Sequence, residues 1–171
     1  MKIVIDSREQ RPLDFSRWEI ETVRGCLPTG DYSVFGYENR IALERKSIND
    51  LVGSVIHQRD RFEAELARGR ELEVFAVVCE CSMRDVARHH YTSRACPESV
   101  LQSLFAFMVR YGTPVIWADS PEGASYVVKS LLSKYLRERH KRQDALLSGS
   151  GDVGMQMRTN EALEPFSADM V

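Results

Sequence analysis

The chain has 171 residues, of which 43% are hydrophobic and 28% are charged, as in an ordinary soluble domain that can bury a core. No apolar run reaches the roughly 18 residues that a membrane-spanning helix needs, and the amino-terminal segment meets an acid too early for a secretory signal. These features exclude a disordered chain, a fibre and a membrane protein, and they predict an intracellular globular protein.

The net charge of −2 does not by itself indicate a nucleic-acid-binding protein. The charge is unevenly distributed, because residues 143–171 contain one base and five acids, which leaves the rest of the chain slightly basic. Eighteen of the 23 bases are arginine, whose planar guanidinium group suits contacts with phosphate. The composition of residues 1–142 is therefore compatible with a phosphate-rich partner.

Short runs of apolar residues bounded by turn residues predict six strands, over residues 2–6, 18–23, 32–35, 40–46, 74–79 and 114–118. Apolar stripes with helical spacing predict four helices, over residues 47–66, 82–88, 97–111 and 121–141. Early strands followed by alternating strands and helices are typical of an α/β fold with a central mixed β-sheet flanked by helices. We expect residues 1–142 to form this domain.

Residues 143–171 contain serine, glycine and acidic residues without hydrophobic periodicity, which predicts a disordered tail. Residues 149–154 match the G-x-G-x-x-G pattern of dinucleotide-binding proteins letter for letter. That pattern requires a strand before it and a helix after it, and neither is expected here. The sequence therefore predicts no nucleotide cofactor.

Chemistry-bearing residues gather at one corner of the predicted sheet. Alternation along the strand over residues 40–46 places Glu44 and Lys46 on one face, opposite the apolar positions. The hairpin brings Asp31 close to Glu44, and Asp50 lies one turn into the following helix. Carboxylates in such a group suit Mg²⁺, which polarises a phosphoryl oxygen, and a neighbouring lysine can stabilise the charge that develops.

Each part of this group also has a purely structural explanation. Gly30-Asp31-Tyr32 is an ordinary turn, Ser47 with Asp50 is a helix cap, and Glu44 with Lys46 is a surface ion pair. Because three acids and a lysine map to one corner, the combination favours a catalytic site over coincidence. Phosphodiester hydrolysis is the reaction that this combination suits.

At these residues the sequence resembles a known family. Gly30-Asp31, followed by Glu44-Arg45-Lys46 and Asp50, is similar to the GDX(n)ERKX(3)D signature of the XPF nuclease family. The opening segment Asp6-Ser7-Arg8-Glu9 resembles the first motif of that family, and residues 110–116 resemble its late helix–glycine–strand passage. The resemblance covers about residues 3–136.

The resemblance implies a restriction-endonuclease-like fold and metal-dependent cleavage of branched or flapped DNA in repair, recombination or replication. It implies that Asp31 and Glu44 are metal ligands, that Lys46 positions the attacking water and that Asp50 completes the acidic site. Mg²⁺ is the expected ion, with Mn²⁺ as a substitute.

The resemblance also implies roles for residues around this centre. Arg45 matches the motif and belongs to the catalytic group, but its position in the strand directs it to the core side. We expect it to pair with Asp6 or Glu9 and to brace the site, a phosphate contact being the other possibility. Arg8 and Glu9 are expected at the edge of the site.

Further contacts with DNA phosphates are expected from a set of basic residues, each of which could equally be a solvated surface residue: Arg59, Arg61, Arg88, His89, His90 and Arg94. The helices over residues 97–111 and 121–141 carry surplus apolar residues, and members of the family pair through their nuclease domains, so we expect a homodimer. The family usually adds a helix-hairpin-helix module, which the sequence after residue 142 does not match. Selectivity for a DNA structure could then depend on a partner.

Two other functional hypotheses remain open from the sequence. A non-catalytic DNA-binding or scaffolding module could retain the fold, although such a module has no need for the full set of acids and lysine. A nuclease acting on RNA or on single strands is the third possibility. The expected location is the cytoplasm or nucleoid in a bacterium or phage-infected cell, and the nucleus in a eukaryote.

Overall fold

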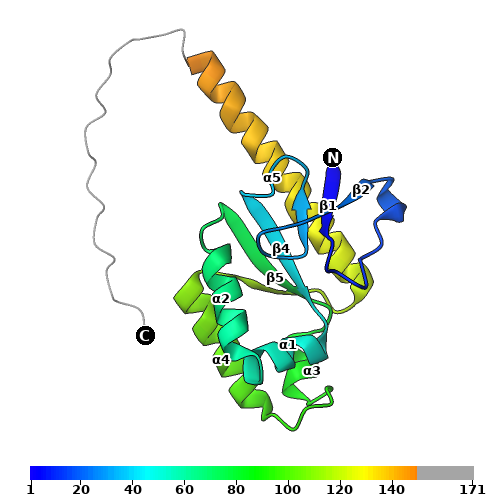
Figure 1. Ribbon diagram of the computed structural model, residues 1–171, viewed down its shortest axis with the longest axis vertical. Helices are drawn as coiled ribbons and strands as arrows, with labels where there is room; N and C mark the ends of the chain where they lie inside the picture. The colour runs from blue at the N-terminus through cyan, green and yellow to red at the C-terminus, as the bar shows by residue number, and fades with distance from the viewer. Residues whose placement is uncertain (150–171) are drawn as a thin grey trace, which may run out of the picture.

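The computed structural model describes residues 1–149, which form a six-stranded mixed sheet with helices on both faces (Figure 1). The strand order is β2-β1-β3-β4-β5-β6. β3 pairs antiparallel with both β1 and β4, whereas the other neighbouring strands are parallel. The strands are β1 (Lys2–Asp6), β2 (Glu21–Gly25), β3 (Tyr32–Val34), β4 (Ile41–Lys46), β5 (Val74–Cys79) and β6 (Val115–Trp117). This mixed sheet confirms the expected fold class.

The helices divide between the two faces of the sheet. One face carries a group of four helices, and a single long helix crosses the other face and projects beyond the sheet (Figure 1). The group of four is α1 (Ile48–Ile56), α2 (Arg59–Gly69), α3 (Met83–Ala87) and α4 (Pro97–Tyr111). The long helix is α5 (Pro121–Gly149), and a short 3₁₀ turn, η1, spans Ser16–Trp18.

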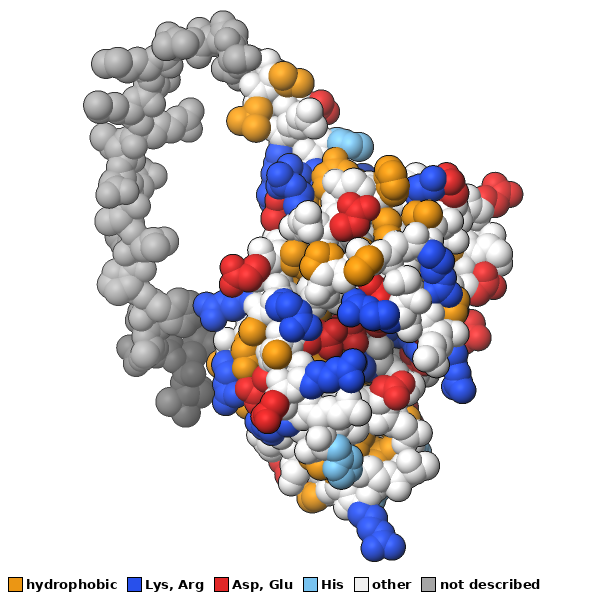
Figure 2. All heavy atoms as spheres, viewed as in Figure 1, with side chains coloured by type: hydrophobic (Ala, Val, Ile, Leu, Met, Phe, Trp, Pro, Cys, Tyr) orange, Lys and Arg blue, Asp and Glu red, His pale blue; other side chains and the backbone are white. Residues whose placement is uncertain are grey.

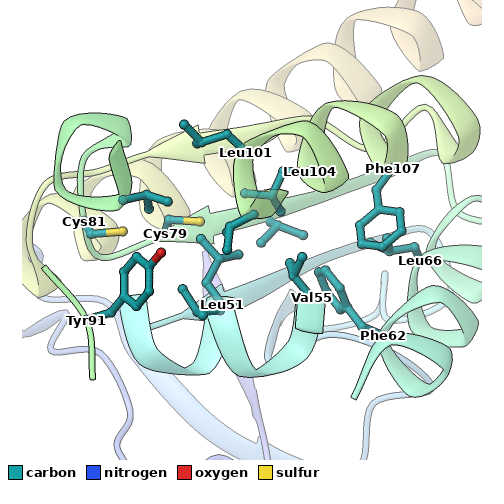
Figure 3. Packing of buried hydrophobic residues seen from close by; sticks show 14 of the residues in the cluster. Leu51, Val55, Phe62, Leu66, Cys79, Cys81, Tyr91, Leu101, Leu104 and Phe107 are labelled. Atoms are coloured by element: carbon teal, nitrogen blue, oxygen red, sulfur yellow. The ribbon is translucent and has the colours of Figure 1, made fainter. Parts of the chain in front are cut away.

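Side-chain alternation along the central strands separates two hydrophobic cores. In β5, Phe75 and Val77 face α1, α2 and α4, whereas Ala76 and Val78 face α5. Figure 3 shows the first core, in which side chains of α1, α2 and α4 point toward one another. Both faces of β4 and β5 are thus covered, which explains their continuous apolar sequences.

The expected helix over residues 47–66 is two helices. The backbone N–H groups of His57 and Gln58 both donate to the carbonyl of Gly53, which ends α1. Gln58 then adopts a non-helical conformation (φ −116°, ψ 32°) and α2 begins at Arg59. The apolar stripe continues across this break because both helices pack on the same core, so periodicity alone did not reveal it.

Two other boundaries differ from the expectation. The second strand lies at Glu21–Gly25 rather than at residues 18–23, because Trp18 ends η1 and packs beside Tyr126 of α5. α5 continues to Gly149, so residues 143–149 are helical rather than part of a disordered tail. The rest of that expected tail, including most of the glycine-rich pattern, lies outside the described residues.

Within residues 1–149, no helix combines the length and the apolarity needed to cross a lipid bilayer.

Candidate active site

A pocket opens where the carboxyl end of β4, the turn before β3 and helix α2 meet. In Figure 2, acidic side chains are recessed near the middle of the visible face, and Lys and Arg side chains surround them. The pocket is lined by charged residues from all three elements, among them Asp31, Glu44, Lys46, Arg61, Glu65 and Arg68. The structure therefore brings Asp31, Glu44 and Lys46 together, as the sequence predicted.

The turn that carries Asp31 is fixed by Gly30. Gly30 has a left-handed backbone (φ +75°), and a Cβ there would lie 3.0 Å from the Cβ of Ala42 and 3.1 Å from the carbonyl oxygen of Leu43. The N–H of Asp31 donates to that same carbonyl (2.9 Å), and its Oδ2 accepts from the backbone N–H of Arg45 (2.9 Å). Asp31 is thus held against β4 by backbone contacts on two sides.

Gly30→Ala is therefore expected to destabilise the fold by about 1–3 kcal/mol, because it combines a strained positive φ with a close approach to β4. The same change should weaken divalent-cation binding, since Asp31 must shift with the turn. Thermal melting and Mn²⁺ titration calorimetry on the purified variant measure the two effects. Gly36→Ala provides the control, because Gly36 also has a positive φ but no atom within 4 Å of its Cβ position. Equal cation binding by both variants would contradict this role of Gly30.

The side chains of Glu44 and Lys46 point from β4 toward the pocket. Only 6% of the Glu44 side chain and 14% of the Lys46 side chain are exposed. The Lys46 ammonium donates to Glu44 Oε1 (2.5 Å) and lies 5.3 Å from the ring centre of Phe62 on α2. The stem of Lys46 is therefore confined between strand and helix, and its ammonium is directed at the carboxylates.

Glu65 is a carboxylate of this pocket that the sequence analysis missed. Its Oε2 lies 3.9 Å from the Lys46 ammonium, and its backbone carbonyl accepts from Thr29 Oγ1 (3.4 Å), which ties α2 to the turn before Asp31. In a single helix over residues 47–66, Glu65 was only another polar position. The break at Gln58 turns α2 toward the site, and the sequence carries no proline or glycine at this junction that would have signalled it.

Burial and mutual repulsion oppose ionisation of the acids in this pocket. Burial raises the pKa of Asp31 to about 6, although the backbone N–H of Arg45 favours its charged form. Burial, with the Asp31 carboxylate beside it, raises the pKa of Glu44 well above its usual range. Burial would lower the pKa of Lys46, but Glu44 and Glu65 outweigh it and leave that pKa raised, so the ammonium stays charged.

Asp50 does not join this group. Its Oδ2 accepts from the hydroxyl of Ser47 (2.6 Å), and its backbone N–H donates to the same hydroxyl (3.2 Å). Asp50 is exposed in the first turn of α1, where it lines a different hollow together with Arg45 and Glu80. The capping explanation of this residue accounts for every contact that its carboxylate makes in the structure.

Asp50→Ala is expected to lower the free energy of unfolding by about 1 kcal/mol, because it removes a cap contact and a first-turn acid. Its affinity for Mn²⁺ should stay within about twofold of the parent protein, since no pocket residue loses a partner. Calorimetric titration and thermal melting measure both quantities. Loss of Mn²⁺ binding in this variant would instead support Asp50 as a metal ligand.

Asp6 and Arg8, from the first motif, form part of the pocket wall. Asp6 is only 1% exposed and accepts from the backbone N–H and the guanidinium of Arg8 and from the backbone N–H of Leu27. Burial would raise the pKa of Asp6, but these donors outweigh burial and lower it. Of the two residues expected at the edge of the site, Arg8 lines the pocket together with Asp6, whereas Glu9 does not line it and instead pairs with Arg45.

Arg45 points to the other face of β4, as its position in the strand predicted. Its guanidinium contacts Glu9 (Nε to Oε2, 3.1 Å) and Glu80 (Nη1 to Oε1, 2.8 Å). Of the two partners expected for Arg45, Glu9 is the one observed, and Asp6 pairs with Arg8 instead. Glu80, which follows β5, is a partner that the sequence did not indicate.

The six basic residues expected to contact DNA occupy different places. Arg61 lines the pocket, whereas Arg59 pairs with Glu63 and lies over the ring of Phe107, away from it. The remaining four belong to the segment between α3 and α4, outside the residues that line the pocket: Arg88, His89, His90 and Arg94. In that segment the two histidines already have partners, since His89 contacts the carbonyl of Ser93 and His90 contacts Asp85.

The donor set of the pocket suits a hard divalent cation. Asp31, Glu44 and Glu65 carry three carboxylates against the single Lys46 ammonium. Burial and, after it, repulsion between the acids raise the pKa of Asp31 and Glu44, and a bound cation would offset both effects. Within residues 1–149, no three His, Cys, Asp or Glu side chains already stand as ligands around one point. Only Oε1 of Glu44 contacts the Lys46 ammonium, so its second carboxylate oxygen is the one that could reach a cation without breaking this pair.

Comparisons with known proteins agree on the fold and the family. Residues 5–131 match the family model of the ERCC4 domain. The chain is 25% identical over 172 residues to the DNA repair protein RAD1 of Saccharomyces cerevisiae, a match that covers 88% of this chain and 15% of the relative. The chain thus spans only a small part of that relative.

Two solved structures of XPF from Aeropyrum pernix are similar to the chain. One, a complex with DNA, has a TM-score of 0.65 at 23% identity and covers 80% of this chain and 66% of the other. The second has a TM-score of 0.66 at 22% identity and covers 95% of this chain and 69% of the other. The fold is therefore the restriction-endonuclease-like fold of XPF nuclease domains. Since the family model matches most of its length, the chain belongs to the ERCC4 domain family of XPF-type proteins.

Proposed function

We propose that the protein is a divalent-metal-dependent DNA endonuclease that acts on branched or flapped DNA. The observation that supports this most directly is the pocket in which buried Glu44 lies with Asp31, Glu65 and the Lys46 ammonium. A domain that only bound DNA would gain nothing from three acids in a pocket that faces a polyanion. Such an arrangement has a use when a cation and a phosphodiester meet there.

Asp31 and Glu44 would hold Mg²⁺, or Mn²⁺ in its place, and Glu65 would complete the set from α2. The bound ion supplies Lewis acidity toward a phosphoryl oxygen and a water of lowered pKa. Lys46 keeps its proton among the acids, so it can donate hydrogen bonds to the attacking water or to the charged oxygens of the transition state. The wall formed by Phe62 excludes solvent beside that ammonium.

DNA is the proposed substrate because of what the similar proteins are. RAD1 is a DNA repair protein, and one of the similar XPF structures is a complex with DNA. A role in repair, recombination or replication inside the cell follows from the same proposal. The motif resemblance supports branched DNA, and the preferred branch is a question for the assay.

A second copy of the chain is the proposed partner. Val109 (88% exposed) and Phe105 (42% exposed) lie on the outer surface of α4, and Tyr126 (59% exposed) lies on α5. Phe105 and Val109 are one helical turn apart and form an exposed apolar surface on α4, which favours a protein contact on that face. Sedimentation velocity at assay concentrations is expected to show a dimer that Val109→Glu dissociates, and a monomeric parent protein would contradict this.

The test of the proposed activity is cleavage of labelled duplex, fork, flap and single-stranded DNA, and of matched RNA, with Mg²⁺, Mn²⁺ or EDTA. Metal-dependent cutting of forks or flaps would support the proposal. Binding without cutting of any substrate would support the alternative, a DNA-binding or scaffolding module. Cutting restricted to RNA or single strands would favour the third hypothesis.

Metal binding can be tested separately from cleavage with two neighbouring acids of α2. Glu65 faces the pocket, whereas Glu63 contacts Arg59, Arg110 and Tyr111 on the far side of the helix. In calorimetry without DNA, Glu65→Gln should weaken Mn²⁺ binding by about tenfold or more, and Glu63→Gln should leave it unchanged. Equal binding by both variants would remove Glu65 from the proposed ligand set.

A further inference from the structure

Helix α2 presents two arginines to the mouth of the pocket. Arg61 and Arg68 are seven residues apart, which is about two helical turns and places them on one face roughly 10 Å apart along the axis. Glu65 lies between them on the same face, and all three line the pocket. The helix therefore carries the pattern base–acid–base across the opening.

Both arginines lack the acidic partner that other arginines around the site have. Arg59 pairs with Glu63, Arg8 with Asp6, and Arg45 with both Glu9 and Glu80. Over residues 1–149, neither Arg61 nor Arg68 forms a salt bridge, and both are exposed. Glu65, at helical spacing from both, is turned toward Lys46 instead.

We propose that Arg61 and Arg68 form a phosphate-binding pair that holds one nucleic-acid strand across the pocket. The strand phosphates on either side of the scissile one would contact the two guanidinium groups, and the scissile phosphate would lie over Glu44 and Lys46. This inference rests on the proposed function. It identifies which cations of that site hold the substrate.

Charge explains why such a pair is needed. The floor of the pocket carries Asp31, Glu44 and Glu65, and a phosphodiester approaching three acids meets repulsion unless cations offset it. Guanidinium groups make bidentate contacts with phosphate oxygens and fix their orientation. The distance of roughly 10 Å along the helix axis equals about three rises of about 3.4 Å along one strand, so two phosphates, one of them the scissile one, would lie between the two contacted ones.

The test measures DNA binding without catalysis, on the full chain in EDTA. Fluorescence anisotropy with labelled duplex and fork DNA over a salt series compares the parent protein with Arg61→Gln, Arg68→Gln and Arg70→Gln. Arg70 is the matched control, because it is exposed at the end of the same helix and does not line the pocket. Thermal melts establish that all three variants fold.

Arg61→Gln and Arg68→Gln are each expected to weaken binding about tenfold at low salt and to reduce the slope of log K against log salt by about 1. Arg70→Gln should change neither quantity. Equal losses in all three variants would show a general effect of charge and overturn the pair, as would unchanged binding in the two pocket variants.

The same variants separate this inference from the proposed function. The parent protein could cut DNA while Arg61→Gln and Arg68→Gln bind DNA normally. That result would disprove the phosphate-binding pair and leave the proposed endonuclease function standing. Both variants could bind DNA more weakly while the parent protein cuts no substrate. That result would support the phosphate-binding pair, contradict the proposed endonuclease function and favour a DNA-binding module. In an active enzyme, the pair predicts a raised KM for both variants.

Discussion

Glu44→Gln is expected to reduce cleavage by at least about 10²–10³-fold and to leave the fold intact. The change removes one negative charge and preserves the shape of the side chain. Glu44 is buried against Asp31 and Glu65, so its carboxylate is the one best placed to bind a cation away from water. Loss of that charge removes a ligand of the cation on which the proposed cleavage depends.

The same substitution should stabilise the metal-free protein near pH 7. Burial raises the pKa of Glu44 in the folded state, so the folded protein holds this proton more tightly than the unfolded chain does. The folded state is therefore penalised as pH rises above the unfolded value of about 4.3, and the penalty grows until the folded pKa is reached. Glutamine cannot ionise, so it removes this penalty.

Thermal melting between pH 4 and pH 8, with and without Mn²⁺, measures this effect. Each kcal/mol corresponds to about 2–4 °C in Tm for a domain of this size. In EDTA, Glu44→Gln should melt at or above the temperature of the parent protein at pH 7, and the difference should vanish near pH 4. Mn²⁺ should stabilise the parent protein and not the variant.

Asp14→Asn is a suitable control, because Asp14 is an exposed acid whose side chain accepts local bonds from the backbone and side chain of Ser16 and does not line the pocket. It should neither respond to Mn²⁺ differently from the parent protein nor change the cleavage rate. Cleavage at the parental rate by Glu44→Gln would contradict the assignment of Glu44 to the metal site. A fall in its Tm of several degrees at pH 7 would show a structural role for Glu44 instead.

The parts of the fold that follow from alternation could be predicted. In β4 the sequence Ile41–Lys46 assigns each side chain to a face by its position, so Glu44 and Lys46 were correctly separated from Arg45. Both faces of this strand are buried along most of its length, and a shift by one residue would place charges in a core. Register is therefore strongly determined here, and with it the floor of the pocket.

The contribution of α2 could not be predicted, because it depends on a change of helix direction. The break at Gln58 has no proline or glycine at the junction and keeps the apolar stripe continuous. Two adjacent N–H groups share one carbonyl there, which is a local hydrogen-bond choice that hydrophobic periodicity does not report. Glu65 and Arg68 reach the site only because of this turn.

Asp50 shows the opposite difficulty, in which a motif position has two explanations. Ser47 and Asp50 have the spacing of a helix cap as well as that of a nuclease signature. The structure places the carboxylate on the cap, 2.6 Å from the Ser47 hydroxyl. Spacing alone does not distinguish these roles, because both require an acid in the first turn after β4.

Arg45→Ala is expected to destabilise the protein by about 3–5 kcal/mol, the largest stability effect among the site residues. The side chains of Arg45, Glu9 and Glu80 are only 11%, 7% and 12% exposed. Alanine would leave two carboxylates largely buried, close together and without their shared cation. Only Glu9 keeps another donor, the backbone N–H of Arg11 (2.6 Å).

The expected fall in Tm is about 6–20 °C, by the conversion given above. Arg40→Ala is the matched control, because Arg40 lies just before the same strand and pairs with Glu73 in a more exposed setting. That variant should lose less than about 1 kcal/mol. Denaturant unfolding of both proteins measures the difference.

Neutralising the two acids distinguishes loss of charge balance from loss of packing. If unpaired carboxylates cause the damage, Arg45→Met combined with Glu9→Gln and Glu80→Gln should recover most of the stability, because no buried charge is left without a partner. Cleavage should return with the fold if Arg45 only braces the strand that carries Glu44 and Lys46. A stable triple variant that binds Mn²⁺ normally and fails to cut would show instead that Arg45 acts on the substrate.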